Sequence, residues 1–276
     1  MLTINFQSLW KKQAELCTLI NETDCHIVIG TETWLTPDVN NSELLLPNFH
    51  IFRKDRSPRA DGVTARGGGV MIAVSNFLSC EEIPTSSDTK TIFVKIKLRN
   101  KKTLIIGSVY RPPNFSLDQS TKTIKEIYNI FDKNKRAVFS IGGDFNIPDI
   151  DWANQEVIGN QYQKEINQKF LEMSQDLGLQ QLVNFPTRGT STLDLLFTTH
   201  PSFVKNCSPH PGLGDHEAIQ TTTTLNPPKK KPVSRRIQLW NKADESAIQK
   251  AALDLKIRFL ETYTVKDNVN DIWIFI

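Results

Sequence analysis

The sequence predicts a layered α/β (or α+β) domain in which mixed β-sheets pack against helices. Some of the expected strands follow one another through short turns, as at Asn100 to Lys102, whereas others are separated by amphipathic helical segments such as 120–132. Short turns pair strands antiparallel, and helical crossovers pair them parallel. Because one chain without internal repeats contains both kinds of connection, mixed sheets in a layered domain are favoured.

Length and composition bound the class of protein. The chain has 276 residues, 39% apolar and 23% charged, which is typical of a globular protein with one large domain and a tail, or two small domains. No apolar run approaches the roughly 20 residues of a membrane span, so no membrane partner is expected. The four cysteines lack CxxC spacing, which favours reduced thiols over a zinc site or disulfides. Since the net charge is only +3, any attraction to nucleic acid must come from local clusters.

The first third of the chain alternates strands, a helix and turns. A strand is expected at 2–5, and Ser8 can cap a helix through about Ile20 whose apolar residues recur on one face. The apolar strand 27–30 leads directly into Thr31 to Trp34. Polar residues with Pro58 and Gly62 indicate a surface loop from Arg53 to Arg66. Gly67 to Gly69 is expected to be a turn into strand 70–74, because no Gly-Lys-Ser/Thr of a phosphate-binding loop follows.

The middle of the chain predicts a hairpin followed by helix-linked strands. Residues 91–98 alternate apolar and charged side chains, as expected of a half-exposed strand, and 103–110 follows the turn until Pro112 and Pro113 break it. The amphipathic segment 120–132 predicts a helix. The expected elements after it are a buried strand at 138–143, a helix at 161–177 ended by Gly178, and strands at 192–198 and 218–224. Gly142 and Gly143 permit a sharp turn or a close approach to a ligand.

The composition changes after Leu225. Residues 226–236 read NPPKKKPVSRR, so we expect domain boundaries at 1–225, a basic proline-rich linker at 226–243 and a tail at 244–276. The tail has a helical pattern from Asp244 to about Glu261, and it ends in an apolar run that indicates the start of a longer downstream region. Lys229 to Arg236 fits a nuclear localisation signal, a nonspecific DNA clamp or a plain linker.

Polar residues recur where the predicted strands end. Each one alone is more typical of a turn or of ordinary packing than of catalysis. Together they supply the oxygen ligands that Mg²⁺ prefers, and a histidine with carboxylates for proton handling. The set is Asn5, Glu32, Tyr110, Asp144, Asn146, Asp194, Asp215 and His216.

These residues stand in six ordered motifs: N-x-x-S-L at Asn5, TETWL at Glu32, SVYRPP at Tyr110, GGDFN at Asp144, STLDLLF at Asp194 and GDHEAI at Asp215-His216. The series resembles the endonuclease domain of non-LTR (LINE-type) retrotransposons, in the apurinic/apyrimidinic-endonuclease-like branch of the endonuclease/exonuclease/phosphatase superfamily. The resemblance covers about residues 2–225. It implies a four-layered sandwich of two mixed β-sheets flanked by helices, which the strand pattern alone does not fix.

The resemblance implies a role for each residue on the metal side. Glu32, helped by Asn5, would hold a divalent metal, Mg²⁺ or alternatively Mn²⁺, on the scissile phosphate. Asp144 would orient or deprotonate the attacking water. Asn146 would position that water or the phosphate.

On the phosphate side, the resemblance implies that His216 stabilises the transition state through a non-bridging oxygen. Asp194 would fix the tautomer of that histidine. Tyr110 would contact the phosphate, and Asp215 would border the metal and leaving group. The product would be a single-strand DNA nick with 3′-hydroxyl and 5′-phosphate ends. In the family, that 3′-hydroxyl primes reverse transcription of the element's RNA.

The expected partners are double-stranded DNA, the element's RNA and a reverse transcriptase region outside this chain, since nothing resembling a polymerase is present. Loop cations would neutralise backbone phosphates, with solvated loops as the alternative. These cations are Arg111, Arg66, Arg56, Arg59 and Lys54. Target preference is expected in the loops after Asp55 and around 187–190, through DNA shape.

Two departures from the family pattern leave alternatives open. Gly214 stands where the family has serine, and Gln7 where the repair enzymes have an acidic residue. One alternative is a phosphodiesterase or phosphatase of the same superfamily with a non-DNA substrate. The other is a decayed, non-catalytic fragment that binds nucleic acid without cutting it.

Overall fold

The computed structural model describes residues 1–276 except 45, 57–66, 100–101, 226–242 and 264–276. It divides the chain into two units, Met1–Lys230 and Lys231–Ile276. The expected linker 226–243 therefore lies, apart from its last residue, outside the described residues. The two units are described separately.

The first sheet of unit 1 has six strands in the order β13-β14-β1-β2-β4-β3. Its neighbours β1 and β2 pair in parallel, which follows from the helical crossover α1 (Gln13–Glu22) between them. The other pairs are antiparallel. The bounds are β1 (Leu2–Asn5), β2 (Ile27–Thr31), β3 (Phe49–Lys54), β4 (Val70–Ser75), β13 (Val204–His210) and β14 (Ala218–Thr223).

The second sheet repeats this plan in the order β11-β12-β8-β7-β6-β5. Here β7 and β8 are the parallel pair, joined through α2. The bounds are β5 (Cys80–Ile83), β6 (Thr91–Lys97), β7 (Thr103–Tyr110), β8 (Val138–Asp144), β11 (Gln180–Gln181) and β12 (Asp194–Thr198), and a separate ribbon pairs β9 (Ile150–Asp151) with β10 (Glu156–Val157).

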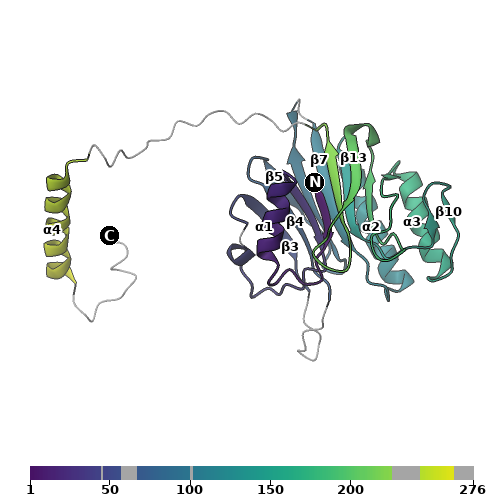
Figure 1. Cartoon of the computed structure of the whole chain (residues 1–276), viewed down its shortest axis with the longest axis horizontal. Helices are drawn as coiled ribbons and strands as arrows, with labels where there is room; N and C mark the ends of the chain where they lie inside the picture. The colour runs from purple at the N-terminus through teal and green to yellow at the C-terminus, as the bar shows by residue number, and fades with distance from the viewer. Residues whose placement is uncertain (45, 57–66, 100–101, 226–242, 264–276) are drawn as a thin grey trace. The chain divides into compact units, whose positions relative to one another are not determined.

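Three apolar cores define four layers. One core joins the outer face of the first sheet to α1 (Gln13–Glu22) through residues such as Leu16 and Val28. A second lies between the sheets and includes Ile72 and Ile106. The third joins the second sheet to α2 (Leu117–Lys133) and α3 (Lys164–Asp176) around Phe139. Figure 1 shows α1 on one outer face and α2 with α3 on the other. The expected four-layered sandwich of mixed sheets is confirmed.

The helix boundaries correct one expectation and explain another. Ser8 does not cap α1: its φ is 80°, its N–H donates to the Glu32 carbonyl, and the helix begins at Gln13. The second helix begins earlier than the apolar pattern indicated, because Ser116 forms a capping box with Gln119. Gly178 follows α3 with φ 60°, as expected of a glycine that ends a helix.

The short and edge strands were not predicted. Arg53 and Lys54 belong to β3 rather than to a loop, and β5, β11 and β13 had no strong alternation to mark them. The expectation that 91–98 is half exposed is wrong over most of its length. Residues 91–94 of β6 are buried on both faces, because one face packs on the other sheet and the opposite face on α2.

The glycines before Asp144 serve packing rather than an approach by a ligand. A Cβ on Gly143, which has φ 138°, would lie 2.0 Å from the Val109 carbonyl oxygen. A Cβ on Gly142 would lie 2.9 Å from Thr3 Oγ1 of the facing sheet. The pair therefore lets β8 pass close to its neighbours, which corrects the expectation from sequence.

The described part of unit 2 is the helix α4 (Glu245–Thr262), whose first turn is capped by the Asp244 carboxylate. This matches the helical pattern expected from Asp244 to about Glu261. None of the residues of this described helix is buried. Among the described helices, none has the length and apolar character needed to span a membrane. No disulfide links the four cysteines, all of which are described.

Candidate active site

The parallel strand pairs of the two sheets bring four predicted site residues together. Asn5 ends β1, Glu32 follows β2, and Tyr110 and Asp144 end β7 and β8, where they are partners in register. Parallel strands end at the same edge of a sheet, so each pair presents its polar residues at one edge. The Asn5 Nδ2 donates to Asp144 Oδ2 at 3.0 Å, and this bond joins the first sheet to the second.

A buried carboxylate–histidine cluster lies beside that bond. Asp194 begins β12 and is the register partner of Asp144 on β8. The His216 Nδ1 lies 2.6 Å from Asp194 Oδ2, and the two side chains are 3% and 2% exposed. Asp144, Asp194 and His216 each offer a ligand atom within 4.8 Å of the others. The structure therefore brings together three residues that are far apart in the sequence.

Burial raises the pKa of two groups at the site, Asp144 and Tyr110. The pKa of Asp144 lies well above its usual range, first because the carboxyl group is buried and then because Asp194 and Glu32 are negatively charged neighbours. The pKa of Tyr110 is also raised by burial and by the Glu32 carboxylate, so the phenol stays protonated at neutral pH. Burial and the neighbouring carboxylates thus disfavour the ionised form of Asp144 in the protein alone.

The residues around Glu32 adopt a backbone that favours glycine, although they are not glycines. Glu32 has φ 53° and Trp34 has φ 57°. The carboxylate Oε2 of Glu32 accepts from Trp34 Nε1 at 2.5 Å and from the Gly68 N–H at 2.6 Å. The turn at Gly67 to Gly69 has three consecutive positive φ angles and packs directly on Thr33 and Trp34. The glycine run therefore supports the Glu32 loop. The positive φ angles of Glu32 and Trp34 are strained, and such strain is typical of functional sites.

Arg111 is not a surface cation, which corrects its assignment as a DNA contact. The residue is 0% exposed. The guanidinium donates to the Asn146 carbonyl at 2.9 Å and to Ser120 Oγ at 3.3 Å, and it lies over the Tyr162 ring. In return, Asn146 Nδ2 donates to the Arg111 carbonyl at 3.0 Å. Arg111 therefore shapes the loop that holds Asn146, which has φ 49°.

Asp215 lies at the exposed rim of the cluster. Its carboxylate pairs with Arg188 at 2.6 Å, and its other oxygen is 3.7 Å from His216 Nε2. Its N–H donates to Gln7 Oε1 at 3.2 Å. Arg188 comes from the hairpin around 187–190, so this hairpin reaches the end of the site that carries His216.

The other cations predicted as DNA contacts lie in different parts of the structure. Arg66 and Arg59 lie outside the described residues, and Lys54 donates from β3 to the Ser86 carbonyl. Arg56 lies beside Gly68, on the Glu32 side of the site. Lys90 was not singled out from sequence, although its Nζ lies 5.4 Å from the Tyr110 ring centre. Burial lowers the pKa of Lys90, and the Glu32 carboxylate offsets part of that lowering. Lys90 lies beside Tyr110 only in the folded chain, and none of the six sequence motifs contains it.

The donor set fits a divalent cation. Asp144 Oδ1 and Asp194 Oδ1 are buried and have no hydrogen-bond partner among the described residues. Orphaned buried carboxylate oxygens are costly unless a cation or proton neutralises them. Hard carboxylate oxygens are the ligands that Mg²⁺ and Mn²⁺ take in proteins. Divalent-metal use is therefore supported by the residues present.

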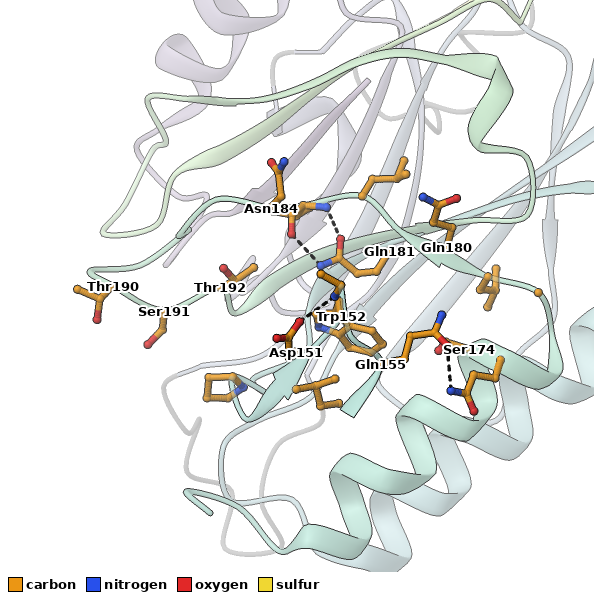
Figure 2. A pocket seen from close by; sticks show the side chains of 18 residues that line it. Asp151, Trp152, Gln155, Ser174, Gln180, Gln181, Asn184, Thr190, Ser191 and Thr192 are labelled. Carbon is orange, nitrogen blue, oxygen red and sulfur yellow. Dashed lines mark hydrogen bonds between the residues drawn. The ribbon is translucent and has the colours of Figure 1, made fainter. Parts of the chain in front are cut away.

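A pocket of about 1060 Å³ lies away from this cluster. Figure 2 shows Thr190 and Ser191 at one end of the pocket and Ser174 at the other, with Trp152 between them. The described residues that line it include no lysine or arginine and none of the predicted site residues. The pocket is therefore formed by other residues than those of the candidate site.

Comparisons with known proteins agree with this geometry. The model of the family described as "Endonuclease-reverse transcriptase" matches residues 104–220. No curated protein matches the chain. The endonuclease domain of TRAS1, a telomere-specific non-LTR retrotransposon, is 19% identical with a TM-score of 0.58, over 79% of this chain and 94% of that one. The AP endonuclease LMAP from Leishmania major is 14% identical with a TM-score of 0.62, over 80% and 86%. An AP endonuclease from Archaeoglobus fulgidus is 14% identical with a TM-score of 0.57, over 81% and 98%.

The family match supports the resemblance drawn from the six motifs. The structural matches show that the fold is that of the AP endonucleases and the wider endonuclease/exonuclease/phosphatase superfamily. The family match spans the motifs at Tyr110, Asp144, Asp194 and His216, which are the residues that the fold brings to one edge.

Proposed function

We propose that this protein, which has the fold of the endonuclease/exonuclease/phosphatase nucleases, is a metal-dependent DNA endonuclease. It would hydrolyse one strand of a duplex and leave 3′-hydroxyl and 5′-phosphate ends. The observation that carries the proposal is the buried Asp144–Asp194–His216 cluster, with two carboxylate oxygens that no described group satisfies. Such a cluster at a strand-end edge suits hydrolysis at a charged phosphorus centre.

The histidine side of the cluster stabilises the phosphate. The Asp194 bond to Nδ1 fixes the orientation of the His216 ring and favours the proton on that nitrogen. When His216 is protonated, its Nε2–H donates to a non-bridging phosphate oxygen, where negative charge develops in the transition state. Tyr110, which remains protonated, is a second donor to the phosphate.

The carboxylate side of the cluster handles the attacking water. Asp144, in its ionised form, orients the water and accepts its proton, and Asn5 holds the carboxylate in place. Asn146, in a loop that Arg111 fixes, would position that water or the phosphate. Glu32 and Asn5, which is bonded to Asp144 with its unsatisfied oxygen, would hold Mg²⁺ or Mn²⁺. Such a cation would neutralise charge on the phosphate and the leaving oxygen.

The proposed substrate is chromosomal duplex DNA, and the proposed context is a LINE-type element. The description of the matching family pairs an endonuclease with a reverse transcriptase, and this supports a nick whose 3′-hydroxyl primes synthesis on the element's RNA. A nuclear location follows from that substrate. The basic segment Lys229 to Arg236, which would direct it there, lies outside the described residues.

A closed circular plasmid tests the proposal, because it offers no free ends to an exonuclease or phosphatase. Purified protein with Mg²⁺ should convert supercoiled plasmid to open circles, and EDTA should stop the conversion. DNA ligase should reseal the circles, since it requires 3′-hydroxyl and 5′-phosphate ends. Absence of open circles with either Mg²⁺ or Mn²⁺ would contradict the proposal. Circles that ligase cannot reseal would contradict the stated end chemistry.

Two matched controls separate chemistry from contamination. His216→Ala should abolish conversion, whereas His50→Ala, which changes an exposed histidine on β3, should not. If His216→Ala nicks as fast as the unaltered protein, the activity does not belong to this site.

A further inference from the structure

Gly214, which precedes the Asp215–His216 pair, is not a backbone requirement. It does not adopt the left-handed φ that favours glycine. The space beside it is taken by Gln7: a Cβ on residue 214 would lie 3.0 Å from Gln7 Oε1 and 3.3 Å from Gln7 Cβ. A side chain at residue 214 would therefore crowd Gln7 and require it to shift by a few tenths of an ångström.

Gln7 also joins the two ends of the site through hydrogen bonds. Its N–H donates to Asn5 Oδ1 at 3.1 Å, and Asn5 donates from its other side to Asp144 at 3.0 Å. Its side-chain Oε1 accepts the Asp215 N–H at 3.2 Å. A continuous series of contacts thus runs from the water-handling carboxylate to the turn that carries His216.

The amide of Gln7 suits this position because it is neutral. A carboxylate there would accept the same N–H but would add a negative charge beside Asp215, whose carboxylate already lies near His216. Like charges at short range disfavour each other. A neutral amide accepts the Asp215 N–H and holds the turn. It adds no negative charge that would attract the metal ion or the groups that donate to the phosphate.

We infer that Gln7 is a positioning residue that fixes the Asp215–His216 turn against Asn5 and Asp144. Gln7 and Gly214 are in close contact, so a larger residue at 214 requires Gln7 to shift from the position in which it accepts the Asp215 N–H. The activity readout of this inference rests on the proposed nuclease function, whereas its structural readout does not.

A double-variant cycle tests the pairing. We expect Gln7→Ala and Gly214→Ser each to lower the kcat for plasmid nicking roughly tenfold, because displacement of a catalytic group by part of an ångström costs rate. The KM for DNA should change less than about twofold, since the proposed role of Gln7 is to position His216 rather than to bind the duplex. The double variant should be about as fast as Gln7→Ala, because the introduced hydroxymethyl group then has room and adds no further loss. Losses that simply multiply in the double variant would overturn the pairing.

Hydrogen exchange supplies the readout that needs no activity. By NMR on the metal-free full chain, the Asp215 amide should exchange at least roughly tenfold faster in Gln7→Ala, because its acceptor is gone. Gln7→Glu should keep the slow exchange but lower kcat, because it retains the acceptor and adds charge. Gln168→Ala, on the exposed face of α3, is the matched control and should change neither quantity.

The two failures are distinguishable. If the unaltered protein does not nick DNA but Gln7→Ala speeds Asp215 exchange, the proposed function fails and the positioning role stands. If Asp215 exchange is the same in Gln7→Ala and in the unaltered protein, the positioning role is wrong whatever the activity.

Discussion

Arg111 and Asn146 are joined by two reciprocal hydrogen bonds. The Arg111 guanidinium donates to the Asn146 carbonyl at 2.9 Å, and the Asn146 carboxamide donates back to the Arg111 carbonyl at 3.0 Å. Both side chains are buried. This reciprocal pair ties the break after β7 to the loop after β8, so the proline-rich segment that follows Tyr110 is part of the support of the site.

The pair predicts that Arg111→Ala destabilises the protein rather than weakening DNA binding. Removal of the guanidinium leaves buried carbonyl oxygens unsatisfied, which costs about 3 kcal/mol of unfolding free energy. Urea unfolding measures this cost. Arg111→Lys should also be destabilising, since an ammonium cannot reproduce the planar fork. A variant with normal stability and weaker DNA binding would restore Arg111 as a phosphate contact.

Asp194→Asn should lower kcat roughly 10²-fold or more, because an amide at this position no longer stabilises a protonated His216 and can favour the wrong tautomer. The KM for DNA should change little, since Asp194 is 1% exposed and does not reach the surface. Single-turnover nicking with excess enzyme measures the chemical step. Asp132→Asn, at an exposed site on α2, is the matched control. An equal loss in both variants would argue against an orienting role.

The raised pKa of Asp144 predicts how the stability of the metal-free protein depends on pH. A carboxyl group that binds its proton more tightly in the folded than in the unfolded state stabilises the fold below the unfolded pKa, near 4. That contribution is lost as the pH rises through the raised folded pKa. In EDTA, the unaltered protein should therefore lose stability relative to Asp144→Asn as the pH rises, by up to about 1.4 kcal/mol per pH unit.

Urea unfolding of both proteins between pH 4 and 8 gives this difference directly. Mg²⁺ should reduce this difference in stability, because a bound cation compensates the negative charge of the ionised cluster. A difference that stays constant with pH would show that Asp144 titrates normally, and a difference of opposite sign would show that its ionised form is the one stabilised by folding.

Lys90 is predicted to contact a DNA phosphate beside Tyr110. Lys90→Gln should weaken duplex binding and lower the slope of log affinity against log salt by about 1, which is the loss of one phosphate contact. Fluorescence anisotropy at several salt concentrations measures the slope. Lys135→Gln, at an exposed ion pair near the end of α2, is the control. An unchanged slope in Lys90→Gln would place this cation away from the DNA path.

The motifs could be placed from sequence because each adjoins a strand with an apolar core. The structure then brings Asp144, Asp194 and His216 within reach of one another. Arg111 was misassigned because its burial depends on α2 and on the loop after β8, which contact it only in the folded chain. Lys90 was missed for the same reason. Edge strands such as β13 were not predicted, because their apolar and polar side chains alternate only weakly.

The most direct test of the central claim compares plasmid nicking by the unaltered protein and by Asp144→Asn at equal concentration in Mg²⁺. The amide can keep the bond to Asn5, so the fold is preserved while the proton acceptor is lost. Circular dichroism confirms equal folding. We expect metal-dependent open circles from the unaltered protein and at least roughly a 10²-fold lower rate from the variant. Equal rates from the two proteins would contradict that claim.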